Sequence, residues 1–73
     1  MAREIIEVPI TGKIINVQCK VGDTVKEGDT ICVIESMKME NPILAPMAGR
    51  VIEVKVTTGQ VATSGNVIAI FEY

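Results

Sequence analysis

Apolar residues occur along this 73-residue chain in short runs, separated by frequent glycine-containing turns. No stretch of ten or more residues keeps the period of a helix, so no helix is expected. Short strands at such spacing favour a β-sandwich or a β-barrel. The eight predicted strands lie near residues 4–8, 13–19, 24–26, 31–35, 39–44, 50–56, 61–62 and 67–72.

The chain contains an internal repeat. A shift of 37 residues aligns Pro9–Ile14 with Pro46–Val51 and sorts all six glycines into three pairs. The pairs are Gly12 with Gly49, Gly22 with Gly59, and Gly28 with Gly65. Glycine reaches positive φ without steric cost, so the paired glycines mark sharp turns. The repeat predicts one domain, residues 1–73, whose halves (about 1–37 and 38–73) form similar sheets related by a pseudo-dyad.

The apolar composition agrees with an all-β class. Ten Val and eleven Ile accompany a single Leu, and β-branched side chains suit a pleated sheet better than a helix. The repeat aligns Cys19 with Val56 and Cys32 with Ala69, so both cysteines occupy apolar positions. Buried cysteine behaves as a small hydrophobic residue. We therefore expect both thiols in the core, without a redox or ligand role.

Several functional classes are disfavoured by what the sequence lacks. The net charge is −2, and no basic stripe suited to nucleic acid is present. There is no His and no Cys cluster, so we expect neither a metal site nor catalytic residues. No apolar run approaches the roughly 18 residues of a membrane span, and the first residues lack a signal peptide's apolar core. We expect a monomer without membrane contact, located in the cytoplasm, or in the mitochondrial matrix or a plastid as part of a longer chain.

The turn between the two halves has unusual chemistry. Met37 and Lys38 lie near its tip, whereas two-residue hairpin loops favour Asn-Gly or Asp-Gly because both central residues need positive φ. An ordinary residue in that conformation costs about 1–2 kcal/mol. Strain kept in place of glycine suggests a functional constraint, and predicts a positive or unusual φ at Met37 or Lys38. The repeat aligns Tyr73 with Ser36, so the termini should lie at the end of the molecule opposite this turn.

The segment Glu35-Ser36-Met37-Lys38-Met39-Glu40 resembles the attachment motif of the biotinyl (biotin/lipoyl attachment) domain family. The run Val-Gly-Asp-x-Val-x-x-Gly-Asp at residues 21–29 and Pro-x-x-Gly at residues 46–49 extend the resemblance over nearly the whole chain. The family implies a barrel-sandwich hybrid, which is a flattened barrel of two four-stranded antiparallel sheets. It also implies that biotin protein ligase attaches biotin covalently to Lys38. Met37 and Met39 match the flanking positions that the ligase recognises, and Glu35 matches an acidic position three residues before the lysine that we also assign to ligase recognition.

The resemblance implies a carrier rather than an enzyme. The biotin arm would move carboxyl between a biotin carboxylase and a carboxyltransferase or decarboxylase. Ser36 departs from the commonest residue, alanine, and the segment between Pro9 and Gly28 has no room for the protruding thumb loop of many acetyl-CoA carboxylase subunits. The chain is therefore similar to the thumbless carriers of pyruvate carboxylase, propionyl-CoA-type carboxylases, transcarboxylase and sodium-pumping decarboxylases.

Two alternatives remain open from the sequence. A lipoyl carrier shares the fold and an exposed turn lysine, although lipoyl domains typically show Asp-Lys-Ala where this chain has Met37-Lys38-Met39. Some short attachment proteins accept either group. An unmodified barrel-sandwich module used for assembly needs no lysine at the tip, but usually separates its halves with a long helical hairpin. The acceptor of the carboxyl group is not encoded in this sequence, because that specificity belongs to partner subunits.

Overall fold

The computed structural model describes residues 2–73, and its regular elements are all strands, as the sequence predicts. Each of the eight predicted strands is present. They are β1 (Arg3–Glu7), β2 (Gly12–Val17), β3 (Thr24–Val25), β4 (Thr30–Ser36), β5 (Met39–Leu44), β6 (Gly49–Val54), β7 (Val61–Ala62) and β8 (Val67–Glu72). No helix occurs in the described part of the chain, so none is present that could cross a membrane.

Two predicted strands are too long at their C-terminal ends. The predictions 13–19 and 50–56 overran β2 and β6, which end at Val17 and Val54. After Val17 the Gln18 N–H still donates to the Ile31 carbonyl oxygen at 2.8 Å, and the chain then enters a turn in which the Lys20 N–H donates to Asp23 Oδ2 at 3.1 Å. Cys19 nevertheless still faces the core, as its apolar alignment requires.

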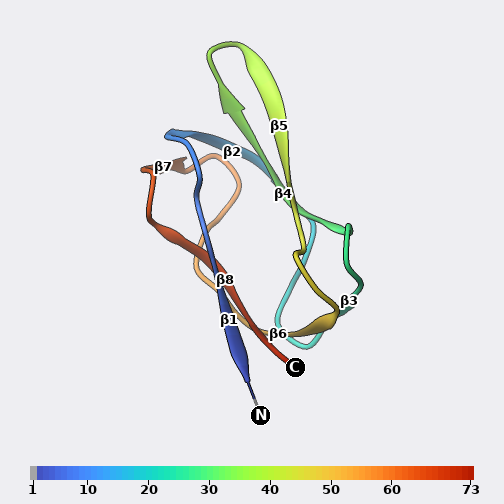
Figure 1. Ribbon diagram of the computed structural model, residues 1–73. Coiled ribbons are helices and arrows are strands. Elements are labelled where there is room, and N and C mark those ends of the chain that lie inside the picture. The colour runs from blue at the N-terminus through green and yellow to red at the C-terminus, as the bar shows by residue number, and fades with distance from the viewer. Residues whose placement is uncertain (1) are drawn as a thin grey trace.

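The strands form two four-stranded antiparallel sheets, ordered β1-β8-β6-β3 and β5-β4-β2-β7. The pseudo-dyad exchanges the two sheets, pairing β1 with β5, β2 with β6, β3 with β7, and β4 with β8. Each sheet draws two strands from each half of the sequence, so the halves are interleaved rather than stacked (Figure 1). The predicted pair of similar sheets is confirmed, while the exchange of strands between halves was not foreseen.

The turns repeat as closely as the strands do. The glycines at residues 22, 28, 59 and 65 have φ between 90° and 97°, a region that favours glycine. The polar residue that follows each glycine caps its turn by accepting a hydrogen bond from the backbone N–H three residues earlier. These acceptors are Asp23, Asp29, Gln60 and Asn66, at 2.9–3.1 Å.

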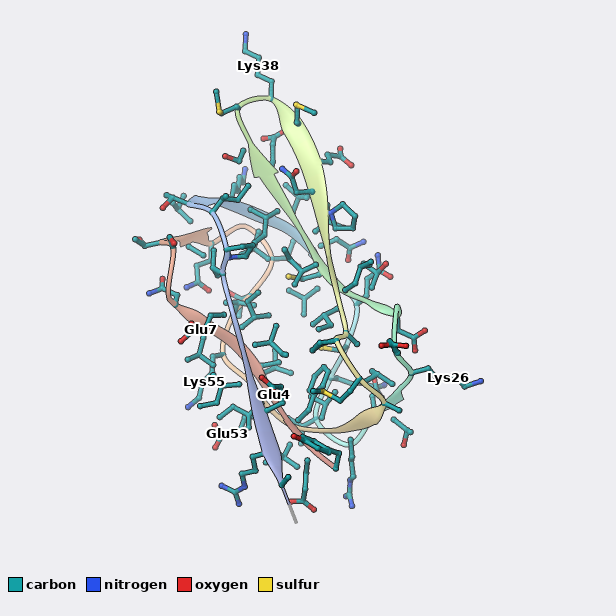
Figure 2. All side chains as sticks on the ribbon, viewed as in Figure 1. Glu4, Glu7, Lys26, Lys38, Glu53 and Lys55 are labelled. Atoms are coloured by element: carbon teal, nitrogen blue, oxygen red, sulfur yellow. The ribbon has the colours of Figure 1, made fainter. Side chains whose placement is uncertain are left out.

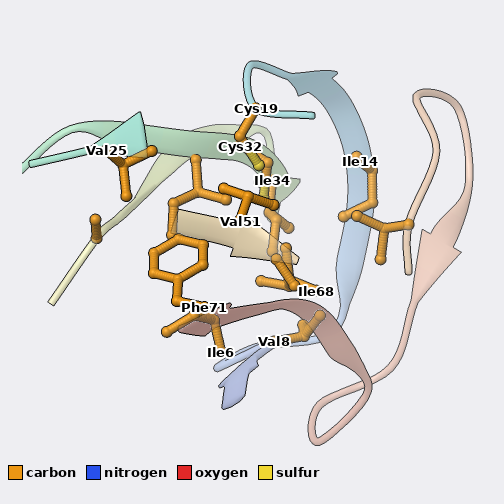
Figure 3. Close-up of a cluster of buried hydrophobic side chains, with 14 of the residues drawn as sticks. Ile6, Val8, Ile14, Cys19, Val25, Cys32, Ile34, Val51, Ile68 and Phe71 are labelled. Carbon is orange, nitrogen blue, oxygen red and sulfur yellow. The ribbon is translucent and has the colours of Figure 1, made fainter. Parts of the chain in front are cut away.

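The core lies between the sheets and has no buried polar side chain among residues 2–73 (Figure 3). The dyad-related residues Ile34 and Phe71 are both fully buried in it. Both cysteines belong to the core: Cys32 is fully buried and Cys19 is 7% exposed, which confirms their predicted apolar positions. The molecule is elongated, with extents of 37 × 18 × 16 Å, and the β4–β5 hairpin projects from the end opposite both termini (Figure 1).

Candidate functional site

The β4–β5 hairpin closes through a two-residue turn made of Met37 and Lys38. Their φ values are +53° and +64°, which confirms the prediction of a positive φ at this turn and applies it to both residues. Positive φ at both central positions is the signature of the type I′ turn, whose twist matches that of the flanking strands. In residues 2–73, these are the two non-glycine residues with positive φ. The backbone strain of the molecule is thus concentrated at this tip.

Lys38 stands at the end of the hairpin and extends away from the body of the domain (Figure 2). Exposure does not set it apart, because Lys13, Lys20, Lys26 and Lys55 are exposed too. Lys38 differs from these lysines in its place on a strained turn. Within residues 2–73 the one salt bridge joins Lys55 Nζ to Glu53 Oε2 at 3.2 Å, so the Lys38 ammonium group is not held by a carboxylate.

The two methionines beside Lys38 are also displayed to solvent. The side chain of Met37 is 92% exposed and that of Met39 is 67% exposed, so neither fills the core. The carbonyl oxygen of Met39 accepts a hydrogen bond from Asn41 Nδ2 at 3.2 Å, which steadies the strand just after the turn. Flexible thioether side chains adapt to a partner's surface. Their exposure at the tip fits contact with another protein better than packing.

A charged row crosses the outer face of the sheet two residues below the tip. Glu35 pairs with Glu40 on β5 and with Lys13 on β2, and Lys13 pairs in turn with Val61 on β7. Directly opposed residues of an antiparallel pair project from the same face. Sequence reasoning identified Glu35 but missed Glu40 and Lys13. The register of a two-residue turn would have placed Glu40 opposite Glu35, whereas the Lys13 contact depends on the β2–β4 pairing.

The cysteines lie away from this site and are poorly suited to reaction. Burial raises the pKa of the Cys32 thiol to about 11, and the nearby Cys19 thiol adds to that rise. Burial also raises the pKa of Cys19, with a further contribution from the charge of Asp23 and an opposing backbone hydrogen bond. Thiols are reactive as thiolates, so both remain unreactive at neutral pH.

The chemistry available at the tip is that of one free amine. A lysine amine is mostly protonated at neutral pH and is a weak nucleophile, so it needs an activated acyl donor. Residues 2–73 hold no cluster of three or more His, Cys, Asp or Glu side chains that could bind a metal ion. The geometry suits a covalent group attached at Lys38, because the amine is exposed, forms no salt bridge within the described residues and lies at the tip of a projecting hairpin.

The chain resembles known proteins both in sequence and in fold. A family model described as "Biotin-requiring enzyme" matches residues 4–71. The gamma subunit of methylmalonyl-CoA decarboxylase from Propionigenium modestum is 53% identical over 36 residues, which are 49% of this chain and 27% of that protein. The large subunit of 2-oxoglutarate carboxylase from Hydrogenobacter thermophilus is 51% identical over 37 residues, which are 51% of this chain and 6% of that protein. The chain thus matches only a small part of each relative.

The fold also has a close structural counterpart. A single-chain, multi-domain long-chain acyl-CoA carboxylase contains a domain that matches 94% of this chain with a TM-score of 0.90 and 30% sequence identity. That match covers 7% of the carboxylase chain. The predicted fold class, two four-stranded antiparallel sheets in a flattened barrel, is confirmed by the sheets themselves and by this likeness.

Proposed function

Because this chain belongs to the biotin/lipoyl family of biotin-requiring enzymes, whose model matches residues 4–71, we propose that it is a biotin carboxyl carrier and that Lys38 holds the biotin. The observation that carries the proposal is the tip itself. An exposed lysine occupies a strained two-residue turn at the far end of the molecule, between two exposed methionines. The two-residue turn imposes positive φ at both positions, and Asn or Gly would adopt it at lower cost, so keeping Met37 and Lys38 there suggests a functional constraint.

Attachment is an acyl transfer to Lys38 Nζ. The deprotonated amine attacks the acyl carbon of biotinyl-adenylate, which biotin protein ligase supplies. An amide bond forms at Nζ, the bond between the acyl carbon and the phosphate oxygen breaks, AMP leaves, and the amine proton passes to a base on the ligase. When bound, biotin supplies a ring nitrogen that carries a carboxyl group. The domain contributes a fixed point of attachment, and the tether raises the effective concentration of the arm at each partner's active site.

The partners we propose are biotin protein ligase and the components that load and unload the arm, a biotin carboxylase and a carboxyltransferase or decarboxylase. The relatives named above are a decarboxylase subunit and a carboxylase subunit, which supports this class of partner. Lys38 stands clear of the body of the domain, so one arm is able to visit two different sites (Figure 2).

Intact mass spectrometry tests the attachment site. The chain is coexpressed with a biotin protein ligase, and separately with a lipoate ligase, and each product is weighed. We expect the mass of one biotinyl group on the unchanged chain and on Lys26→Arg, and none on Lys38→Arg. Lys26 is an exposed lysine away from the hairpin, so it is a matched control (Figure 2). A lipoyl group without a biotinyl group would select the lipoyl carrier, and no modification by either ligase would overturn both.

Recognition by the ligase is proposed to involve Met37, Met39 and Glu35. Replacing both methionines with alanine is expected to lower kcat/KM for biotinylation about tenfold or more, which corresponds to about 1.4 kcal/mol of lost transition-state binding. For Glu35 the chain offers an internal control, because Glu72 occupies the dyad-related position in the other sheet. Glu35→Gln should slow the ligation and Glu72→Gln should not. Equal rates for the two variants would refute a role for Glu35.

A further inference from the structure

Strand β1 leaves one of its edges without a partner. Among the described strands it contacts β8 and no other. Ala2 and Tyr73 exchange both of their backbone hydrogen bonds at 2.9 Å, and at the other end of the strand Val8 bonds to residues 65 and 66. Successive residues of an antiparallel strand turn their N–H and C=O groups to opposite sides. The backbone groups of Arg3, Ile5 and Glu7 therefore point away from β8, toward solvent.

The same three residues present their side chains on the outer face of the sheet. All three are exposed, and the exposure of Ile5 is 53%, which is high for a large apolar residue in a strand. In chain order the edge carries a cation, an apolar side chain and an anion, spaced two residues apart. When a second copy of the strand is placed antiparallel to the first, the cation meets the anion and the apolar side chain meets its own counterpart.

We propose that β1 pairs with β1 of a second copy of this chain in an antiparallel arrangement centred on Ile5. In this register Ile5 lies opposite Ile5 of the second copy, and Arg3 lies opposite Glu7 of the second copy. Each of the three outward-facing residues then exchanges two backbone hydrogen bonds with its opposite residue. The ion pairs and the apolar contact form on the same outer face, and the two sheets join into one continuous sheet.

The dyad-related edge of the molecule lacks these properties. On β5 the outward positions are Glu40, Pro42 and Leu44, which the repeat aligns with Arg3, Ile5 and Glu7. Proline has no N–H to donate, so it blunts an edge strand at its centre. Pairing β5 with itself would also place a carboxylate opposite leucine. Pairing β1 with β5 would place Glu7 opposite Glu40, so of these two edges the edge of β1 is complementary to itself and not to β5.

The geometry leaves the proposed carrier function undisturbed. β1 runs from the end with the termini toward the end with the hairpin (Figure 1). Antiparallel pairing therefore directs the two Lys38 tips away from each other, and both remain accessible. One five-residue strand from each copy buries less than a standard protein–protein interface, so the association is weak and depends on concentration.

Sedimentation equilibrium of the unmodified chain tests the proposal, at low salt and from about 10 μM to about 1 mM, a span that reveals weak association. We expect the weight-average mass to rise from 7.9 kDa toward twice that value. Over the same range, hydrogen exchange at the amides of Arg3, Ile5 and Glu7 should slow. A constant monomer mass, which is the expectation from sequence, would overturn the proposal.

Substitutions identify the surface. Ile5→Pro removes the central N–H but reproduces the residue that β5 already tolerates at Pro42, so the domain should fold and remain monomeric. Arg3→Glu or Glu7→Arg alone should weaken the dimer about fivefold or more, and the double variant should restore it, because each change affects two ion pairs. Lys26→Glu makes the same charge change away from β1 and should have no effect. A dimer that survives Ile5→Pro, or that the double variant fails to restore, would refute this interface.

Discussion

The end of the molecule that carries Lys38 and the end that holds the termini share one backbone frame but differ in charge. Near the termini, a row on the outer face of the first sheet alternates in sign. Its members are Arg3, Glu72, Arg50 and Thr24. The equivalent row below the tip consists of Glu40, Glu35, Lys13 and Val61. Glu40 replaces a cation there, so two carboxylates face each other across β4 and β5.

The turn differs between the two ends as well. At the end with the termini, Ala2 before β1 and Tyr73 after β8 are hydrogen-bonded to each other. At the other end, Met37 and Lys38 connect β4 to β5. Like charges directly opposite each other and positive φ at ordinary residues both destabilise a hairpin. The dyad-related end with the termini, which lacks Lys38, shows neither feature among the described residues. These costs therefore belong to the site and not to the fold.

The largest difference in stability is expected between alanine substitutions at the dyad-related glycines Gly12 and Gly49. A Cβ added at Gly12 would overlap the Glu35 carbonyl oxygen and lie 2.6 Å from Ile34 Cγ2, whereas at Gly49 its closest neighbour is the Glu72 carbonyl oxygen at 3.1 Å. Gly12→Ala should lower the free energy of unfolding by about 2–3 kcal/mol through overpacking, and Gly49→Ala by less than about 1 kcal/mol. Urea denaturation measures both. Equal losses would mean that the two ends are packed alike.

The next effect concerns the thiols, which occur in one half only. Folding holds the Cys32 thiol neutral, with its pKa raised from 9.0 to about 11 by burial. The unfolded chain therefore ionises first as the pH rises, and the free energy of unfolding should fall between pH 9 and 11 by about 2 kcal/mol from this group. Replacing Cys19 with Val and Cys32 with Ala copies the other half and should flatten that part of the curve. The free energy of unfolding is measured by urea denaturation at pH 8, 9, 10 and 11. If it falls equally with pH in both proteins, the buried thiols do not cause the fall.

A smaller effect should appear at the strained turn. Met37→Gly relieves a positive φ worth about 1–2 kcal/mol and pays about 0.5–1 kcal/mol in chain entropy, so the domain should gain about 0.5–1 kcal/mol. Biotinylation should slow, because the exposed thioether is lost. Met37→Ala is the matched control, since it keeps a Cβ and its strain but also lacks the thioether. A gain in stability with alanine equal to that with glycine would rule out strain as the cause.

The smallest effect concerns the charged rows. Glu40→Arg gives the tip row the alternating signs of the other end and should stabilise the domain by about 0.3–0.5 kcal/mol at low salt. Arg3→Glu makes the opposite exchange and should destabilise by a similar amount. Both differences should shrink in high salt because the side chains are exposed. Thermal denaturation at two ionic strengths measures them, and a salt-independent change would point to packing instead of charge.

Much of this architecture was predictable from the sequence because the two halves repeat the same pattern of strands and turns. Strand positions follow from runs of Val and Ile between paired glycines, and the positive φ at Met37 and Lys38 follows from the turn length. The exchange of strands between halves did not follow. The repeat is equally consistent with two self-contained sheets, and only long-range pairings such as β2 with β7 distinguish them. Glu40 was missed for a different reason: the turn length places it opposite Glu35, but its significance lies in that cross-strand pairing and not in the motif along the chain.

The interleaving of the strands has a consequence for how such a domain arises. Neither half forms a sheet alone, since each sheet contains two strands from the first half and two from the second. Two identical copies of a half-length peptide would nevertheless supply all eight strands in dyad-related places. The architecture is one that a duplicated gene segment reaches by fusing an ancestral homodimer into a single chain. On that route the hairpin turn at Met37 and Lys38 is the connection between the two fused segments.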